Sequence, residues 1–282
     1  MGIKFVPPDV VERQYRKYLN LYATTYVRLV RAHLKELIPE LRETASTEKP
    51  EEITKIRMDV NVEERIRKLL ELAAEQLDAL FPVSKLRKWA LAMIGGVNRG
   101  SKKNIQKSLR SGYRDKKEVP NFEPLMRDGE LTPYFQNIVD ENVGLIKSIP
   151  QEKTAAFKNE LVLLITQDAN RKTIQEAIDK YVTHAKGKPS VIARDQIGKL
   201  NGQLNEYRQK QLGGKRYRWR TVRDQRVSGK PGGTYPKAKP SHWHREGKVY
   251  LWSNPPKGGH PGQRVQCRCW AEMILDDILE VK

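Results

Sequence analysis

Apolar side chains recur at helical spacing through the first two thirds of the chain, and this periodicity limits the possible folds more than any other feature. Between Asp9 and Arg42 there is no Gly, and no Pro before Pro39. Large residues in that stretch lie three and four positions apart: Tyr15, Tyr18, Leu19, Tyr22 and Tyr26. This spacing predicts an amphipathic helix whose aromatic face packs in a core or against another helix.

More segments before residue 186 show the same period. Helices are predicted over residues 62–81, 84–93, 131–149, 153–166 and 173–184. Pro82 would end one helix and Ser84 would cap the next. Gly95 and Gly96 are expected to interrupt that second helix. A polar break is predicted at residues 45–50, and a connector rich in Pro at residues 119–133.

The pattern changes at residues 186–189, which read Lys-Gly-Lys-Pro. A helix capped by Ser190 is predicted to run to Gly213 and Gly214. Three short strand-like segments follow at 217–222, 248–252 and 267–274, separated by stretches rich in Gly, Pro and Lys. We therefore predict an α+β protein with a mainly helical region, residues 1–185, followed by a small α+β domain with short strands and long loops, residues 186–282.

The excess positive charge is concentrated in the last third of the chain. The formal net charge is +19, and residues 186–282 hold 21 Lys and Arg against 8 Asp and Glu. Such a field favours a polyanion such as double-stranded DNA. An acidic protein partner, or a basic surface that only solvates the fold, would account for the charge equally well.

Two sequence features bear on the compartment. No run of about 18 apolar residues occurs, so no membrane span is expected. The two cysteines, Cys267 and Cys269, are separated by one residue and are too close for an unstrained disulfide. Free thiols fit synthesis in a reducing cytoplasm.

A series of motifs in the C-terminal part occurs in a fixed order. A helix rich in Asn and Gln is followed by a Trp-Arg-Thr strand and turn, a His step, an aromatic strand, a Pro-Gly turn and Cys-Arg-Cys. These motifs are Ala193–Leu204, Trp219–Val227, His242–Gly247, Val249–Trp252, Gly259–Gly262 and Cys267–Glu272. Together they resemble the phage Mu F-like minor head protein family, also called the phage head morphogenesis domain. Ser228–Lys239 departs from the pattern and is interpreted as a loop insertion.

The resemblance implies a structural role and no catalytic residues. Proteins of this family are minor capsid components of tailed bacteriophage heads. They are associated with the portal vertex and head assembly, and some travel with DNA on ejection. We therefore expect a non-enzymatic virion protein, made in the bacterial cytoplasm and located inside the head or near the portal. Its expected partners are the portal protein, the major capsid protein and packaged DNA. The motif residues expected to have structural roles are Trp219, Asp224, Gly247, Pro261 and Gly262.

Several motif residues are of types that bind zinc. The candidate ligands are His242, His260, Cys267 and Cys269, together with Asp224 and His244. A Cys-x-Cys pair within a strand would direct its thiols to opposite faces, so that one of them would reach a shared site. Small buried cysteines without a metal are the alternative interpretation.

A hydrolase is the alternative to a structural protein. Asp224, His242 and Glu246 would form an acid–base group, or Asp224, His242 and Cys267 would hold the metal of a nuclease. The competing interpretation is a buried hydrogen-bonded network that holds loops in place, with Asp224 paired to a nearby arginine, Arg220, Arg223 or Arg226.

Arginines alternate with aromatic residues around the first predicted strand. Strand geometry places Arg216, Arg218 and Arg220 on one face. With Arg223 and Arg226 they would contact a phosphate backbone if exposed; partner docking or a solvated face is the alternative. If the helical region docks on a larger assembly, it should also expose an apolar strip that includes Tyr15, Tyr22 and Trp89.

Overall fold

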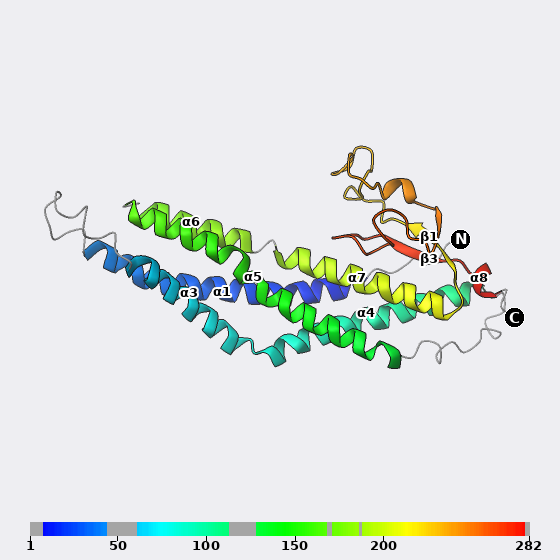
Figure 1. Cartoon of the computed structure of the whole chain (residues 1–282), viewed down its shortest axis with the longest axis horizontal. Coiled ribbons are helices and arrows are strands. Elements are labelled where there is room, and N and C mark those ends of the chain that lie inside the picture. Colours follow the sequence, from blue (N-terminus) through cyan, green and yellow to red (C-terminus); the bar gives the residue numbers. More distant parts are fainter. Residues whose placement is uncertain (1–7, 44–60, 113–127, 168–170, 186–187, 280–282) are drawn as a thin grey trace. The chain divides into compact units, whose positions relative to one another are not determined.

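The computed structural model describes residues 8–43, 61–112, 128–167, 171–185 and 188–279 (Figure 1). Six long helices precede a small sheet in the described ranges. The α+β class is therefore confirmed. The break predicted at 45–50 and most of the connector predicted at 119–133 lie outside the described residues. None of the helices that the structure describes combines the length and apolar character needed to span a bilayer.

The first three helices follow the predicted pattern with one exception. Helix α1 spans Asp9–Glu43, α3 spans Asn61–Leu80 and α4 spans Val83–Gly112. The interruption predicted at Gly95 and Gly96 is wrong, because α4 continues through both glycines. A Cβ on Gly96 would lie 2.7 Å from Cγ2 of Val11. The glycine is needed for close contact with Val11, and not for a turn.

The later helices are longer than predicted. Helix α5 spans Thr132–Thr166 and contains Pro150, so the two segments predicted at 131–149 and 153–166 form one helix. Helix α6 spans Arg171–Ala185. Helix α7 spans Lys188–Gln211, which places Ser190 inside the first turn instead of at the N-cap. Pro189 lies in the first turn of α7. Proline is well suited to this position, because the backbone N–H that it lacks would have no partner within the helix.

The described chain forms two compact units, and each contains segments that are distant in sequence. One unit comprises residues 1–14, 91–139 and 193–282, and the other comprises residues 15–90 and 140–192. Helices α1, α4, α5 and α7 contribute residues to both units. The domain boundary at residue 186 stays a prediction.

The aromatic face of α1 lies in the core of the all-helical unit. Tyr15 and Tyr22 are 1% and 2% exposed, and Trp89 is 8% exposed. Tyr18 stacks on Trp89 with 5.0 Å between ring centroids. The Tyr15 hydroxyl donates a hydrogen bond of 2.8 Å to Oδ1 of Asn142. The prediction that Tyr15, Tyr22 and Trp89 form an exposed docking strip is wrong, and the core interpretation is confirmed.

The other unit contains a three-stranded antiparallel sheet with the order β2-β1-β3. The strands are β1 (Arg216–Arg220), β2 (Val249–Leu251) and β3 (Trp270–Met273). The central strand β1 alternates between arginines, of which Arg216 and Arg218 are exposed and Arg220 is half-buried, and the fully buried side chains of Tyr217 and Trp219. This alternation confirms the predicted strand geometry. A short helix, α8 (Asp276–Leu279), follows β3.

Two apolar clusters stabilise this unit. One joins α4, the residue directly after α7, β3 and α8, and it contains Ile105, Leu109, Leu212, Met273 and Ile278. The second lies beneath the sheet and contains Tyr217, Trp219, Trp252, Cys267, Cys269 and Ala271. The second cluster thus contains both cysteines.

Candidate functional site

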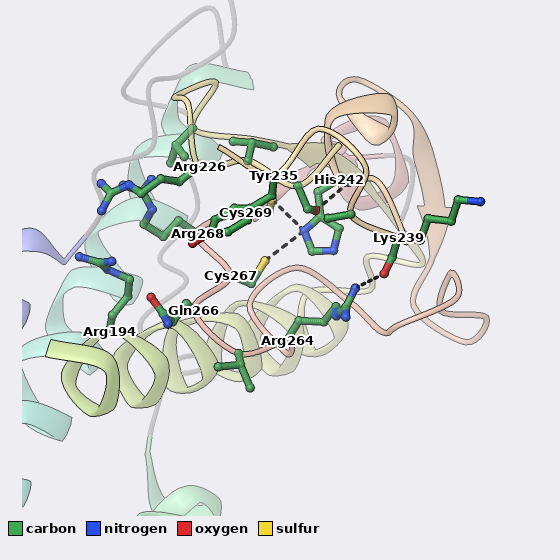
Figure 2. Close-up of a pocket in the computed structure, with 15 residues that line it drawn as sticks. Arg194, Arg226, Tyr235, Lys239, His242, Arg264, Gln266, Cys267, Arg268 and Cys269 are labelled. Atoms are coloured by element: carbon green, nitrogen blue, oxygen red, sulfur yellow. Dashed lines mark hydrogen bonds between the residues drawn. The ribbon is translucent and has the colours of Figure 1, made fainter. Parts of the chain in front are cut away.

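Three buried side chains of metal-binding type, His242, Cys267 and Cys269, lie together beside the sheet. Nδ1 of His242 lies 3.5 Å from each of the two cysteine sulfurs. The three ligand atoms are all within 4.8 Å of one another. Exposure of the three residues is between 6% and 8%. In Figure 2 the two dashed lines from the cysteines converge on the imidazole ring.

Hydrogen bonds to Ser228 place His242. Residue 242 directly precedes a single 3-10 turn, η3 (Trp243–Arg245). Its N–H donates to the carbonyl oxygen of Ser228 at 3.0 Å and lies 3.2 Å from the Ser228 hydroxyl. Within the predicted insertion, the N–H of Gly229 donates to the carbonyl oxygen of Tyr235 at 2.9 Å. The inserted segment therefore folds back on its own start and holds His242 against the cysteines.

The two cysteines lie in a loop that ends where β3 begins at Trp270. Gln266 has a φ of +56°, in the left-handed region. Its N–H donates to Oδ1 of Asp195 on α7 at 3.1 Å. The expectation that strand geometry would separate the thiols is therefore wrong, because the strand starts after Cys269 and both sulfurs face His242.

Close backbone contacts attach this loop to α7. A Cβ on Gly198 would lie 2.9 Å from the carbonyl oxygen of Cys267, and a Cβ on Gly202 would lie 2.6 Å from that of Pro261. Gly262 has a φ of +91°, and its Cβ would lie 2.6 Å from the carbonyl oxygen of Gly198. These glycines allow helix and loop backbones to touch, which fixes the position of the cysteines.

The two thiols differ in pKa because Cys269 donates a hydrogen bond to Cys267. The hydrogen bond from Cys269, with further help from His242, holds the pKa of Cys267 well below its usual range, although burial opposes this. The same contact with Cys267, together with burial, raises the pKa of Cys269. Cys267 is therefore the first of the two thiols to lose its proton.

His260, the fourth ligand predicted from the sequence, lies elsewhere. Its Nδ1 is 2.9 Å from the hydroxyl of Tyr217, and its ring contacts the ring of Trp252 with 5.0 Å between centroids. Burial lowers the pKa of His260, which favours the neutral ring. His260 is thus part of the packing beneath the sheet.

A cavity of about 360 Å³ opens beside the His242, Cys267 and Cys269 group, and all three residues line it. Its wall also carries four arginines: Arg194, Arg226, Arg264 and Arg268. Figure 2 shows these side chains around the cavity, with Arg264 bonded to the carbonyl oxygen of Lys239. The group is therefore accessible to small molecules in cationic surroundings.

Comparison with known proteins finds one family that matches the C-terminal part of the chain. Residues 155–272 match the family described as Phage Mu protein F like protein. Residues 155–272, hereafter called the Mu F-like domain, are therefore similar to this family. The match runs from α5 to β3, so it begins well before residue 186, where the domain was predicted to start. The resemblance predicted from the sequence is therefore confirmed.

An uncharacterized protein of Haemophilus influenzae is 26% identical over 184 residues. The aligned region covers 65% of this chain and 38% of that protein, so the chain spans less than two thirds of the relative's length. No solved structure matches the chain.

The motif residues of the Mu F-like domain shape its backbone and core. Trp219 is fully buried in β1. Gly247, with a φ of +78°, donates its N–H to the carbonyl oxygen of Trp219 at 2.8 Å. Pro261 and Gly262 form the turn that packs on α7. Asp224 accepts a hydrogen bond of 3.0 Å from the N–H of Arg226 and is ion-paired with Arg268.

The acid–base group proposed from the sequence does not assemble. Glu246 accepts hydrogen bonds from the N–H of Thr221 at 2.6 Å and from Arg223 at 3.0 Å. Burial alone would raise the pKa of Glu246, but these hydrogen bonds lower it. Asp224 is likewise held by arginines and is absent from the group formed by His242 and the cysteines.

All five arginines predicted to contact DNA lie in ion pairs. The N–O distances are between 2.5 and 3.9 Å, and the pairs are Arg216–Asp277, Arg218–Glu272, Arg220–Glu272, Arg223–Glu246 and Arg226–Asp224. These carboxylates partly neutralise the face that was expected to bind phosphates. Contact of the five arginines with DNA stays a prediction.

Sequence reasoning missed two arginines of this domain. Arg268 of the Cys-Arg-Cys motif is the partner of Asp224. Arg245 is 7% exposed, and its guanidinium lies 4.9 Å from the centroid of the Trp219 ring. A charged residue inside an otherwise apolar motif was the available signal for Arg268. No local signal pointed to the contact between Arg245 and Trp219, which are 26 positions apart in the sequence.

Proposed function

We propose that this protein is a structural, non-enzymatic component of a tailed-bacteriophage head that acts in head assembly near the portal vertex. The observation that carries the proposal is the match of residues 155–272 to the Phage Mu protein F like family. The motif residues of the domain lie in its core and turns and fix its shape. A fixed shape suits a protein that presents a defined surface to other head proteins.

The portal protein and the major capsid protein are the partners proposed. The relative from Haemophilus influenzae carries no functional description, and the chain spans 38% of its length. The partner assignment therefore rests on the family and requires a direct test in virions.

The test is a mass-spectrometric census of purified virions from the phage or prophage that encodes the protein. The proposal expects the protein in mature heads, at a few copies per virion, and also in heads that lack DNA. It further expects the tagged full chain to co-purify with the portal ring from infected cells. Absence of the protein from both full and empty heads would exclude a head component.

Contact with packaged DNA is a second part of the proposal. Since the predicted arginines are paired with carboxylates, we assign this contact to exposed lysines of the C-terminal loops and strand edges. Four of them take part in no ion pair among the described residues: Lys237, Lys239, Lys248 and Lys257. Unpaired lysines release counterions from DNA at low cost, because no carboxylate competes for them.

DNA retention measured as a function of salt tests this assignment. Binding of the full chain to double-stranded DNA should be independent of sequence and fall steeply with salt, with a slope of about −0.9 per phosphate contacted. Replacement of the four lysines by Gln should reduce that slope. The matched control replaces four exposed basic residues of the all-helical unit: Lys17, Arg28, Lys88 and Lys172. Equal loss in both variants, or binding that is unchanged by salt, would contradict a specific lysine surface.

A further inference from the structure

We propose that the Mu F-like domain binds one zinc ion through Nδ1 of His242 and the sulfurs of Cys267 and Cys269, with solvent as the fourth ligand. The inference goes beyond a role in head assembly and does not depend on it. It rests on the separations of the three ligand atoms, on their burial and on the cavity beside them.

The distances are those of ligands around a tetrahedral zinc ion. With Zn–S of about 2.3 Å and Zn–N of about 2.0–2.1 Å, tetrahedral angles place a nitrogen and a sulfur about 3.6 Å apart. Nδ1 of His242 lies 3.5 Å from both sulfurs. The same geometry places two sulfurs about 3.8 Å apart, and the three ligand atoms here all lie within 4.8 Å of one another. The three atoms thus approach a zinc-binding arrangement without movement of the backbone.

Hydrogen bonds to His242 alone cannot satisfy both thiols. Nδ1 of a neutral imidazole has one lone pair and accepts one good hydrogen bond. Two buried thiols, Cys267 and Cys269, lie at equal distances from that single acceptor, so only one of them can donate to it. A zinc ion would engage both sulfurs and the nitrogen together.

The donor set favours zinc over the hard cations. Two thiolates and one imidazole are soft and borderline ligands, which disfavour Mg²⁺ and Ca²⁺. Within the described part of the chain, no Asp or Glu joins the group as a hard oxygen ligand. The cavity of about 360 Å³ leaves room for a water molecule at the fourth position.

The ion would join two segments that have little regular structure. His242 follows the inserted loop, and the cysteines lie in the loop before β3. A sheet of three short strands supplies few backbone hydrogen bonds across this region. A metal that links loops 25 residues apart in sequence restricts the unfolded chain and stabilises the folded domain.

Metal content of the full chain tests the proposal. The protein is produced with a tag that lacks histidines, purified under reducing conditions without chelator, saturated with Zn²⁺ and desalted. Elemental analysis should then find about one zinc per chain. Replacement by Co²⁺ should produce the thiolate-to-cobalt charge-transfer absorption that reports sulfur ligands. Zinc well below one equivalent in the saturated wild-type protein would overturn the proposal, whatever the variants do.

Matched variants test the identity of the ligands. Cys267→Ser and Cys269→Ser should each lower the zinc affinity at least about 10-fold and weaken the charge-transfer absorption. His244→Ala is the control, because His244 is exposed, lies two residues from His242 and is absent from the group. Circular dichroism identifies any variant that fails to fold. A folded double variant, Cys267→Ser with Cys269→Ser, that still retains one zinc would assign the ion to other residues and refute the site.

Discussion

Nη2 of Arg208 lies 3.3 Å from Oδ1 of Asp128, and Arg208 is 1% exposed. Two other nitrogens of the guanidinium, Nε and Nη1, have no hydrogen-bond partner within the described residues. Burial lowers the pKa of Arg208, and Asp128 acts against that effect. The positive charge of Arg208 on α7 is therefore compensated by the carboxylate of Asp128, which lies 80 positions earlier in the sequence.

We predict that Asp128→Asn destabilises the protein by about 1–3 kcal/mol, because it leaves the buried guanidinium of Arg208 without a compensating charge. Urea unfolding followed by circular dichroism measures the change. Asp276→Asn is the control, since Asp276 is exposed and forms no ion pair within the described residues; its effect should stay within about 0.5 kcal/mol. Equal stability of the two variants would show that Asp128 does not compensate Arg208.

The contact between α7 and the Pro261–Gly262 turn leads to a second prediction. Gly202→Ala should destabilise the protein by about 2 kcal/mol or more, because the new Cβ would lie 2.6 Å from a backbone oxygen that cannot move freely. Gly100→Ala in helix α4 should instead stabilise it by about 0.5–1 kcal/mol, since nothing lies within 4 Å of its Cβ. Thermal unfolding of both variants gives the comparison, and a common sign for the two changes would contradict the packing described.

Acid stability gives a third prediction. Hydrogen bonds from Arg216 lower the pKa of Asp277, although burial opposes them. For Asp224, burial would raise the pKa, but hydrogen bonds from Arg268 and Arg226 lower it. A carboxyl group whose pKa is lower in the folded state stabilises the protein above its unfolded pKa, and this stability is lost as pH falls through the folded pKa. We therefore expect stability to fall below about pH 4.

Asp277→Asn checks the acid effect. The variant should lose stability at neutral pH, and its stability should depend less steeply on pH below about pH 4, because one titrating group is gone. Urea unfolding at a series of pH values measures the slope. An unchanged slope would mean that Asp277 has the same pKa in the folded and unfolded states.

Local patterns predicted the helices and strands well because their causes are local. The spacing of Tyr15, Leu19 and Tyr22 specifies the buried face of α1 whatever packs against it. The alternation in β1 likewise predicted that Tyr217 and Trp219 point inward. Gly96 was misread because its role depends on contact with Val11, which is 85 positions away in the sequence.

The site was only partly predictable for the same reason. The residue types of His242, Cys267 and Cys269 pointed to a metal, but their convergence depends on the left-handed conformation at Gln266 and on the contact of the loop with α7. The partners of the arginines were also hidden, since Arg216 pairs with a carboxylate 61 positions away. Contacts of this kind are set by tertiary structure and leave no periodic signal in the sequence.

The last prediction concerns Tyr15 in the all-helical unit. Its hydroxyl donates to Asn142 in a buried hydrogen bond of 2.8 Å. Tyr15→Phe keeps the ring and removes the donor, so it should cost about 1–2 kcal/mol of stability. Tyr235→Phe is the control, because Tyr235 is 56% exposed, and its cost should be below about 0.5 kcal/mol. Because Tyr15 is buried, co-purification with the portal ring should persist in Tyr15→Phe. A variant of full stability that loses the portal ring would show instead that Tyr15 is part of a docking surface.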